Sequence, residues 1–205
     1  VFIAQSGKDY LVYVPDLDIY TEGISLGDAM EMARDAIGSK GIDLEDDGKE
    51  LPAASDYAGA LEYYKQALSM VTNDEDKADY LYRMANVYVA MKNYQQGAAH
   101  AQQALDINAE DGRCYLLLGI CYASAKIYDD PILQRSVFWV ACDMFRKAKS
   151  VDSSCATDAN KLIATYSQYF PSKEDVFFHR DLNEGASFRV GGWINKTTTC
   201  RSKAE

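Results

Sequence analysis

The most regular hydrophobic pattern in the 205-residue chain lies between Ala78 and Asp106. Apolar or small residues recur there at the three- and four-residue spacing of one helix face, stop at Lys92-Asn93, and then resume. The positions are Leu81, Met84, Ala85 and Tyr88 before the break and Tyr94, Gly97, Ala101, Ala104 and Leu105 after it. The small residues allow two helix backbones to approach closely, so the pattern predicts an αα-hairpin. One hairpin cannot bury all of its apolar surface, and we therefore expect similar hairpins beside it.

The same pattern recurs on both sides of this hairpin. The second-helix positions reappear 37 residues earlier, at Tyr57, Ala60, Tyr64, Ala67 and Leu68. The first-helix positions reappear 34 residues later, at Tyr115, Leu118, Gly119 and Tyr122, and Tyr128 then corresponds to Tyr94. This period, with the LLLGICY run at 116–122, resembles the tetratricopeptide (TPR) repeat. The resemblance implies a mainly α fold, an αα-hairpin solenoid over residues 57–171.

The third repeat is longer than the period requires. Asp129-Asp130-Pro131 interrupts it, and the second-helix pattern returns late, at Ala141, Phe145 and Ala148, which predicts a helix lengthened at its start. Phe138 and Trp139 on that helix either pack on neighbours or form an exposed binding anchor, and packing is the commoner fate of such aromatics. A further helix over 156–170 is expected to cap the solenoid.

The TPR resemblance also implies a concave groove, lined by the first helix of each repeat, that holds a peptide or a helix. The matching positions are Asp79, Tyr82, Asn86, Val89, Arg113, Leu116, Ile120 and Ala123. A basic clamp for chaperone tails would need several Lys or Arg residues, and only Arg113 is present, so we expect a mixed polar and apolar groove for another peptide or protein. The alternative, equally open, is that Tyr82 and Asn86 are ordinary exposed helix residues.

Residues 1–56 predict a separate small α/β unit in the order β-β-β-α. The expected strands are a short apolar run at 1–5, the aromatic segment Tyr10–Val14, and Ile19-Tyr20-Thr21, and Pro15 ends the second of them. Ser25 and Asp28 resemble a capping box that opens the helix. The helix is followed by the acidic, loop-like EDDGKELPAAS.

The ordered series YLVYVPDLDIYTEGISLGDAMEMARDAI and GKELPAAS resembles the HicB family of antitoxins. The resemblance implies a truncated ribonuclease-H-like sheet that binds a small basic HicA-like mRNA-cleaving toxin. The unit carries 13 Asp and Glu residues against 4 Lys and Arg, which would steer it toward a basic partner. The family's final strand and its DNA-binding domain are not visible, so binding to an operator is not expected.

Four residues of this unit are candidates for its partner surface: Asp16, Asp18, Tyr20 and Glu22. An Asp-rich turn after Pro15 explains the two aspartates structurally, and further carboxylate ligands for a metal are not evident. The alternative function, from a different class, is a metal-dependent nuclease that uses Asp16, Asp18 and Glu22 on the ribonuclease-H-like sheet.

Residues 172–205 predict a β-like C-terminal tail. A strand over 184–194 with a bend at Gly191-Gly192 leads to the anchor Trp193. The tail resembles the ending of secreted or envelope TPR proteins from Bacteroides-type bacteria, whereas the antitoxin resemblance favours the cytoplasm. The five cysteines form no C-x-x-C pair and indicate buried, reduced thiols, which also favours the cytoplasm.

Both resemblances break near the same point. The α/β unit lacks a strand after Leu51-Pro52, and the first TPR repeat begins at its second helix. These breaks suggest the hypothesis that residues near Ala53–Asp56 join two polypeptides or mark a place where intervening sequence is skipped. The net charge of −10 argues against a general nucleic-acid surface. Taken together, the sequence predicts a non-enzymatic, cofactor-free protein-binding scaffold.

Overall fold

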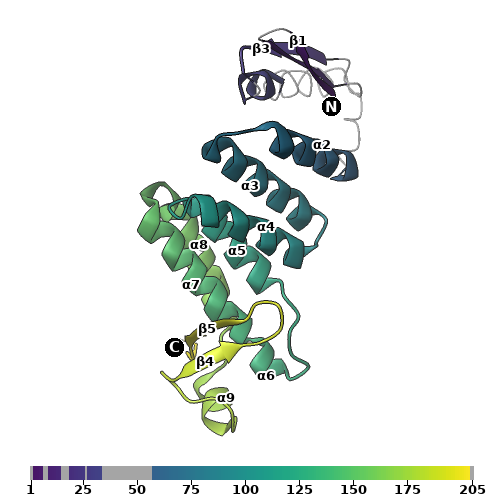
Figure 1. The fold of residues 1–205 in the computed structure, drawn as a ribbon. Helices are drawn as coiled ribbons and strands as arrows, with labels where there is room; N and C mark the ends of the chain where they lie inside the picture. Colours follow the sequence, from purple (N-terminus) through teal and green to yellow (C-terminus); the bar gives the residue numbers. More distant parts are fainter. Residues whose placement is uncertain (1, 7–8, 15–18, 26, 34–56, 204–205) are drawn as a thin grey trace, which may run out of the picture. The chain divides into compact units, whose positions relative to one another are not determined.

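The computed structural model describes residues 2–6, 9–14, 19–25, 27–33 and 57–203 (Figure 1). They form two compact units, Val1–Val71 and Thr72–Glu205. The division predicted at residue 57 stays a prediction, and the chain around Ala53–Asp56 lies outside the described residues. The fold is mainly helical, with a few short strands, as the sequence predicted.

The first unit opens with a three-stranded antiparallel sheet in the order β1-β2-β3. The strands are β1 (Phe2–Ser6), β2 (Asp9–Val14) and β3 (Ile19–Gly23). Ile3 pairs with Val12, and Val12 pairs with Thr21 across the sheet. Val12 is buried with Ala29 and Ala33 of the following helix, so one face of the sheet is covered by that helix. The predicted β-β-β-α order is confirmed.

The helix after the sheet occupies residues 27–33 of the described chain. The Asp28 amide donates to Ser25 Oγ at 3.1 Å, as a helix N-cap requires. The Asp28 carboxylate accepts from the Ile24 amide at 3.0 Å, one residue earlier than in the predicted capping box. Helix α2 (Tyr57–Met70) completes the unit, and the Tyr63 hydroxyl donates to the Met30 sulfur.

The second unit starts with the predicted hairpin, α3 (Asp74–Ala90) and α4 (Tyr94–Ile107). Asn73 caps α3 by accepting from the Asp76 amide at 2.8 Å, and Asn93 caps α4. Lys92 in the turn has φ of 59°, so the chain reverses within three residues. Leu81, Met84 and Ala85 of α3 are buried, and so are Gly97, Ala101, Ala104 and Leu105 of the adjacent α4. The organisation predicted from the spacing is confirmed.

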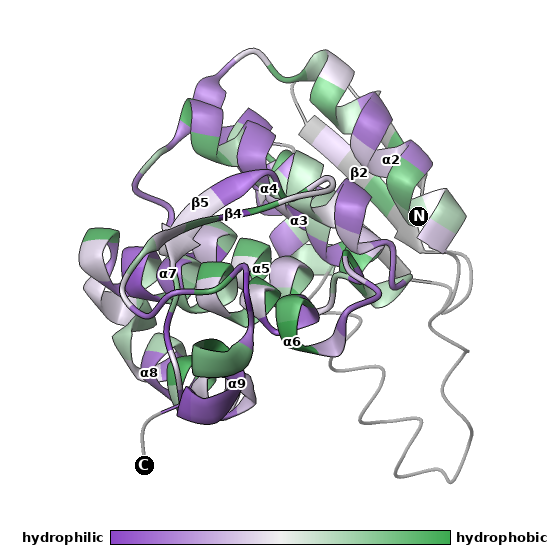
Figure 2. Cartoon of the chain, turned by 90° about the horizontal axis from the view of Figure 1, so that it is seen from below, coloured by the Kyte–Doolittle hydropathy of each residue, from purple (hydrophilic) through white to green (hydrophobic). Residues whose placement is uncertain are grey.

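The third repeat pairs α5 (Gly112–Ala123) with α7 (Ser136–Val151), and a short helix α6 (Pro131–Gln134) lies in the connection. Figure 2 shows both hydrophilic and hydrophobic residues along the helices of this unit. The connection is held by the Gln134 side chain, which donates to Ala125 O at 2.7 Å and accepts from the Ile127 and Tyr128 amides at 2.9 Å. Tyr128 therefore lies in a loop, and its predicted correspondence to Tyr94 at the start of a helix is wrong.

Helices α5 and α7 pack tightly at Gly119. A Cβ placed on Gly119 would lie 2.3 Å from Cε1 of Phe145, and Phe145 is fully buried. Only glycine fits at this contact without movement of the ring. The small position that the repeat pattern identified is therefore a packing requirement.

Helix α7 is followed by η2 (Ser153–Cys155), α8 (Ala156–Tyr166) and η3 (Ser167–Tyr169). Trp139 is fully buried, and Phe138 packs against Tyr166 and Tyr169 with ring centroids 6.0 and 5.2 Å apart. Packing, the favoured of the two predictions for Phe138 and Trp139, is confirmed.

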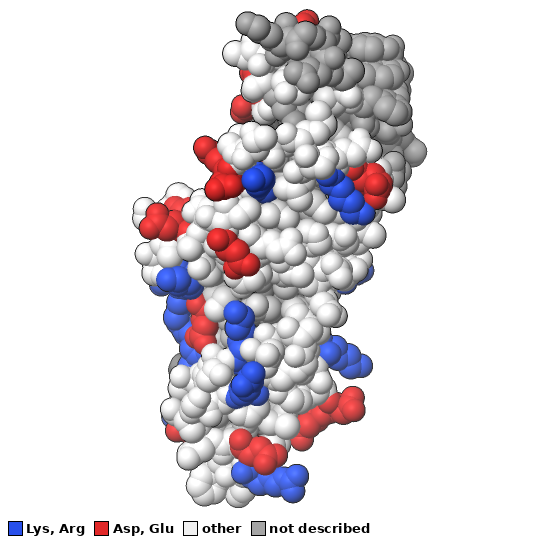
Figure 3. Space-filling model, in the orientation of Figure 1, with Lys and Arg blue, Asp and Glu red and all other residues white. Residues whose placement is uncertain are grey.

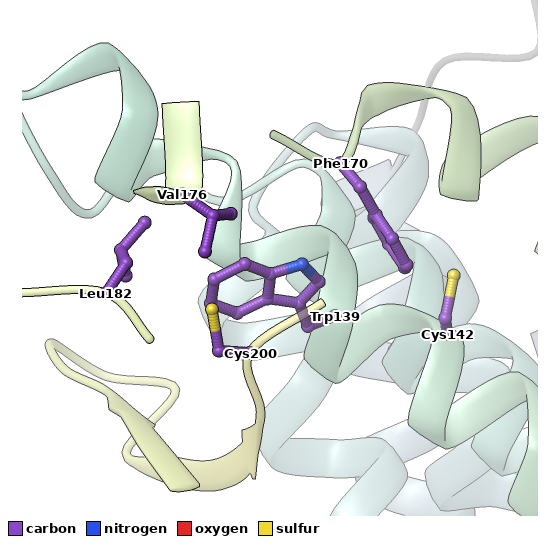
Figure 4. Close-up of a cluster of buried hydrophobic side chains, with 6 residues drawn as sticks. All are labelled: Trp139, Cys142, Phe170, Val176, Leu182 and Cys200. Atoms are coloured by element: carbon purple, nitrogen blue, oxygen red, sulfur yellow. The ribbon is translucent and has the colours of Figure 1, made fainter. Parts of the chain in front are cut away.

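The C-terminal segment contains a short helix that the sequence did not predict, α9 (Lys173–Phe178), before the hairpin of β4 (Ser187–Val190) and β5 (Lys196–Thr199). Six side chains from α7, the end of η3 and the C-terminal segment form one cluster, drawn in Figure 4: Trp139, Cys142, Phe170, Val176, Leu182 and Cys200. The segment thereby covers the side of α7 that carries Trp139 and Cys142.

Arg201 fixes this segment to α7 through polar contacts. Trp139 Nε1 donates to the Arg201 carbonyl at 2.7 Å, and Arg201 Nη2 donates to the Trp139 carbonyl at 2.8 Å. Asp143 Oδ1 lies 2.8 Å from Arg201 Nη2, and the Thr198 hydroxyl donates to the same carboxylate. Two partly buried peptide carbonyls are thus satisfied across 62 residues of sequence, and the Asp143 carboxylate accepts from a residue 55 positions away.

Candidate functional site

A cleft of about 610 Å³ lies along the first helices of the repeats in the second unit. We call it the groove. Its lining is Tyr82 and Asn86 of α3, Arg113, Leu116, Leu117 and Ile120 of α5, Ser154 and Cys155 of η2, and Asp158, Lys161 and Leu162 of α8. Three consecutive helical layers therefore contribute to one concave surface.

Five of the eight residues predicted for the groove line this cleft: Tyr82, Asn86, Arg113, Leu116 and Ile120. Tyr82, Asn86, Leu116 and Ile120 are half-buried, so each presents part of its side chain to the cleft. They meet because equivalent positions of α3 and α5 face the same side when the hairpins stack.

The other three predicted residues lie elsewhere. Asp79 borders a neighbouring cleft, where it binds Arg83 at 2.6 Å. Val89 lies against the next helix, since a Cβ on Gly97 would be 2.9 Å from its Cγ2. Ala123 is the last residue of α5 and does not line the groove.

Helix α8 supplies a wall of the groove that the sequence analysis assigned only to capping. Asp158, Lys161 and Leu162 recur at the three- and four-residue spacing of one helix face. Leu162 lies three residues after Ala159, which is fully buried, and four residues after the exposed Asp158, so it lies at the border between the packed face of α8 and the groove.

Arg113, which lines the groove, contacts three other side chains. Its Nε and Nη2 donate to the two carboxylate oxygens of Asp111 at 3.1 and 2.8 Å, a bidentate pair. Its guanidinium carbon also lies 4.7 Å from the centre of the Tyr82 ring, and Nη1 lies 3.7 Å from Asp79. A cation fixed on an aromatic ring in this way presents a defined direction to a ligand.

The charge state of this pair follows from its geometry. Burial raises the pKa of the Asp111 carboxyl, but the hydrogen bonds and charge of Arg113 outweigh it and hold that pKa below its ordinary value. The Asp111 hydrogen bond raises the pKa of the Arg113 guanidinium above its ordinary value. Both groups therefore stay ionised at neutral pH.

The remaining polar groups of the groove are arranged around an apolar floor. Asn86 Nδ2 donates to the Tyr82 carbonyl at 2.9 Å, which leaves its amide oxygen without a partner among the described residues. Lys161 and Asp158 form an exposed ion pair at 3.3 Å. The floor consists of Leu116, Leu117, Ile120 and Leu162. An apolar floor with a few oriented polar groups suits a peptide or helix better than it suits chemistry on a bond.

Charges of both signs are interspersed over the face of the second unit in Figure 3. The strong acidic excess belongs to residues 1–56, where the net charge is −9, whereas residues 57–205 carry −1. Because residues 57–205 carry almost no net charge, partner choice by the groove depends on individual placed charges.

The residues predicted for the partner surface of the first unit are only partly described. Asp16 and Asp18 lie outside the described residues. Tyr20 pairs with Tyr13 in the sheet, and Glu22 is exposed on β3.

Within the described ranges no three His, Cys, Asp or Glu side chains are grouped to hold a metal, and no helix there is long and apolar enough to cross a membrane.

No family model matches the chain. Protein unc-45 homolog B of Xenopus laevis is 33% identical over 86 residues, which is 42% of this chain and 9% of that protein. The Photosystem I assembly protein Ycf3 of Synechococcus elongatus is 37% identical over 62 residues, 30% of this chain and 36% of that protein. The same protein of Synechococcus sp. strain CC9902 is 32% identical over 76 residues, 37% and 44% of the two chains.

The matches thus span less than half of each of these relatives. The relatives are repeat proteins of the TPR type, which supports the TPR resemblance. The comparisons give no support to the HicB resemblance of residues 1–56.

Proposed function

We propose that this chain is a non-enzymatic protein-binding scaffold and that its groove holds a peptide or helical segment of a partner protein. The observation that carries the proposal is the groove itself, in which α3, α5 and α8 place an apolar floor beside the fixed cation Arg113. Similarity to the Photosystem I assembly protein Ycf3 supports the same class of function.

The groove favours an amphipathic segment. Its floor offers Leu116, Ile120 and Leu162 to apolar anchors spaced along one face of a helix or along alternate residues of an extended chain. Arg113 would meet an acceptor on the partner, and the free oxygen of Asn86 would meet a donor. A few buried anchors of this kind supply most of the binding energy at peptide interfaces.

A displayed library of random peptides, selected against the 205-residue chain, tests this proposal. Ile120→Asp places an uncompensated carboxylate on the groove floor, and we expect selected peptides to lose about ten-fold or more in affinity. Met91→Glu is the matched control, because Met91 is 44% exposed and does not line the groove. Peptides that bind Ile120→Asp as tightly as they bind the unchanged chain would refute the proposal.

For the first unit we propose the finer role that its resemblance implies, binding of a small basic ribonuclease of the HicA-like toxin class. The β-β-β-α order and the exposed Glu22 on β3 support it, together with the local net charge of −9. The test is titration of the chain with such a toxin, with Asp16→Asn and Asp18→Asn as variants. RNA cleavage by the chain alone with Mg²⁺, lost in Asp16→Asn, would instead support the nuclease alternative.

A further inference from the structure

A second cleft, of about 300 Å³, lies where the start of α7, η3 and the C-terminal segment meet. It is lined by Arg135, Phe138, Gln168, Tyr169, Phe170, Ser172 and Lys203, and we call it the aromatic cleft. It shares no lining residue with the groove. A ligand bound here would therefore touch none of the residues that line the groove.

The aromatic side chains that line the aromatic cleft belong to a row of stacked rings and form the solvent-exposed end of that row. Phe145 stacks on Tyr166 with centroids 5.6 Å apart, Tyr166 stacks on Phe138 at 6.0 Å, and Phe138 lies 5.2 Å from Tyr169. Phe145 is fully buried, whereas Tyr169 is 54% exposed. The row thus runs from the core to the surface, and a further aromatic ring placed in the cleft would extend it.

Two cations border this cleft, and none of its lining residues is acidic. Arg135 has one carboxylate contact, 3.4 Å to Asp175 Oδ2, and that oxygen already accepts from the Ser172 amide at 3.0 Å. The other guanidinium N–H groups have no partner within the described part of the chain. The Lys203 backbone is fixed by its hydrogen bond to the Pro171 carbonyl at 2.8 Å, and its ammonium has no acidic partner among the described residues.

We propose that the aromatic cleft binds an acidic peptide segment that carries an aromatic anchor residue. The anchor ring would stack in the cleft beside Tyr169, and flanking carboxylates would pair with Arg135 and Lys203. The volume of about 300 Å³ suits one large side chain with part of its backbone, which is smaller than a typical cofactor site.

The overall negative charge of the chain allows the effect of the two cations at the cleft to be distinguished from the effect of the net charge. At a net charge of −10, the protein as a whole repels acidic peptides. At physiological salt the screening length is about 8 Å, so only nearby charges act strongly. A preference for acidic over neutral peptides would therefore report the two local cations rather than the field of the molecule.

The test is a titration of the ¹⁵N-labelled 205-residue chain with the blocked tripeptide Glu-Phe-Glu, followed by NMR. We expect saturable shifts centred on Gln168 and Tyr169, with affinity at least about three-fold above that of Gln-Phe-Gln, since two exposed ion pairs each add a modest factor. Glu-Ala-Glu should bind at least about ten-fold more weakly, because it lacks the ring.

Variants locate the site. Tyr169→Ala should weaken binding of Glu-Phe-Glu by about five-fold, because it removes an aromatic contact, and Lys203→Ala by about two-fold, because it removes an exposed ion pair, while circular dichroism shows that both variants stay folded. Phe177→Ala is the matched aromatic control, because the Phe177 ring is 81% exposed and does not line the cleft. Lys196→Ala is the matched control for charge, on the exposed surface of β5.

Four results would overturn the proposal: no binding at 10 mM tripeptide (roughly the weakest affinity that a specific contact of this size would give), equal binding of Gln-Phe-Gln, a loss in Phe177→Ala equal to that in Tyr169→Ala, or equally tight binding of free phenylacetate. The last result would assign the cleft to small aromatic acids instead of peptides.

Discussion

Gly119 allows the packing of the third repeat to be tested by adding one methyl group. In Gly119→Ala the new Cβ would lie 2.3, 2.7 and 2.8 Å from Cε1, Cδ1 and Cζ of Phe145. Ordinary carbon contacts are about 3.5–4.0 Å. The ring would have to move by more than 1 Å (roughly the difference between these distances), yet it is fully buried and stacked on Tyr166.

The expected change in stability combines two opposing effects. Overpacking of a buried contact costs about 1–3 kcal/mol, and the clash with Phe145 places this case near the upper end. Alanine is favoured over glycine within a helix by about 1 kcal/mol. We therefore expect Gly119→Ala to lower the free energy of unfolding of the second unit by about 2 kcal/mol.

Urea unfolding followed by tryptophan fluorescence measures this change. The two tryptophans, Trp139 and Trp193, both lie in the second unit, so the signal reports that unit alone. With an m-value of about 2 kcal/mol per molar urea, the midpoint should fall by about 1 M. Adding Phe145→Leu should recover part of the loss, as a favourable coupling in a double-mutant cycle. A midpoint equal to or above that of the unchanged chain would refute the packing argument.

Three further predictions concern buried groups. Trp139→Phe removes the donor to the Arg201 carbonyl and should cost about 1–3 kcal/mol in thermal or urea unfolding; an unchanged midpoint would contradict the role of that bond. The pKa of Asp111 is lower in the folded chain than the unfolded value of about 3.9, so the ionised carboxylate stabilises the fold above that value. This stabilisation is lost as the pH falls through the folded pKa. Asp111→Asn should therefore flatten the decline of the unfolding free energy below about pH 4. Burial raises the pKa of Cys114 and Cys121 to about 12, so both thiols should resist iodoacetamide at pH 8 until the chain is unfolded; rapid labelling of the native chain, detected by mass spectrometry, would contradict this.

The hairpin of α3 and α4 was predictable because its signals are local. Three- and four-residue spacing gives the helix faces, and the polar break at Lys92-Asn93 gives the turn. The same reasoning placed Gly119 at a helix contact, since the repeat pattern required a small residue there. Local chemistry also explains the β-β-β-α order of the first unit.

The C-terminal segment was less predictable because its structure depends on distant contacts. Arg201 and Trp139 exchange hydrogen bonds across 62 residues, and neither residue shows that partner in its own neighbourhood. Helix α9 is only six residues long, and it forms with Val176 buried against α7. Short elements of this kind depend on tertiary packing more than on their own propensity.

Only part of the groove lining could be predicted, because two of its helices follow the repeat spacing and the third does not. Tyr82 and Ile120 were found because α3 and α5 follow the repeat, so their equivalent positions converge. Lys161 and Leu162 were missed because α8 follows an enlarged repeat, and the insertion around α6 shifts it out of the period. Because α8 does not follow the repeat spacing, its contribution to the groove could not be predicted from that spacing.

The most direct test of the scaffold proposal is site-specific photo-crosslinking to a library-selected peptide. A photoreactive amino acid is placed at Leu116 in the groove or at the exposed Met91 as the control. If the groove holds the partner, crosslinks should form at position 116 and be suppressed there by excess unlabelled peptide, with little labelling at position 91. Equal crosslinking at both positions, or crosslinking at 91 alone, would contradict the central claim.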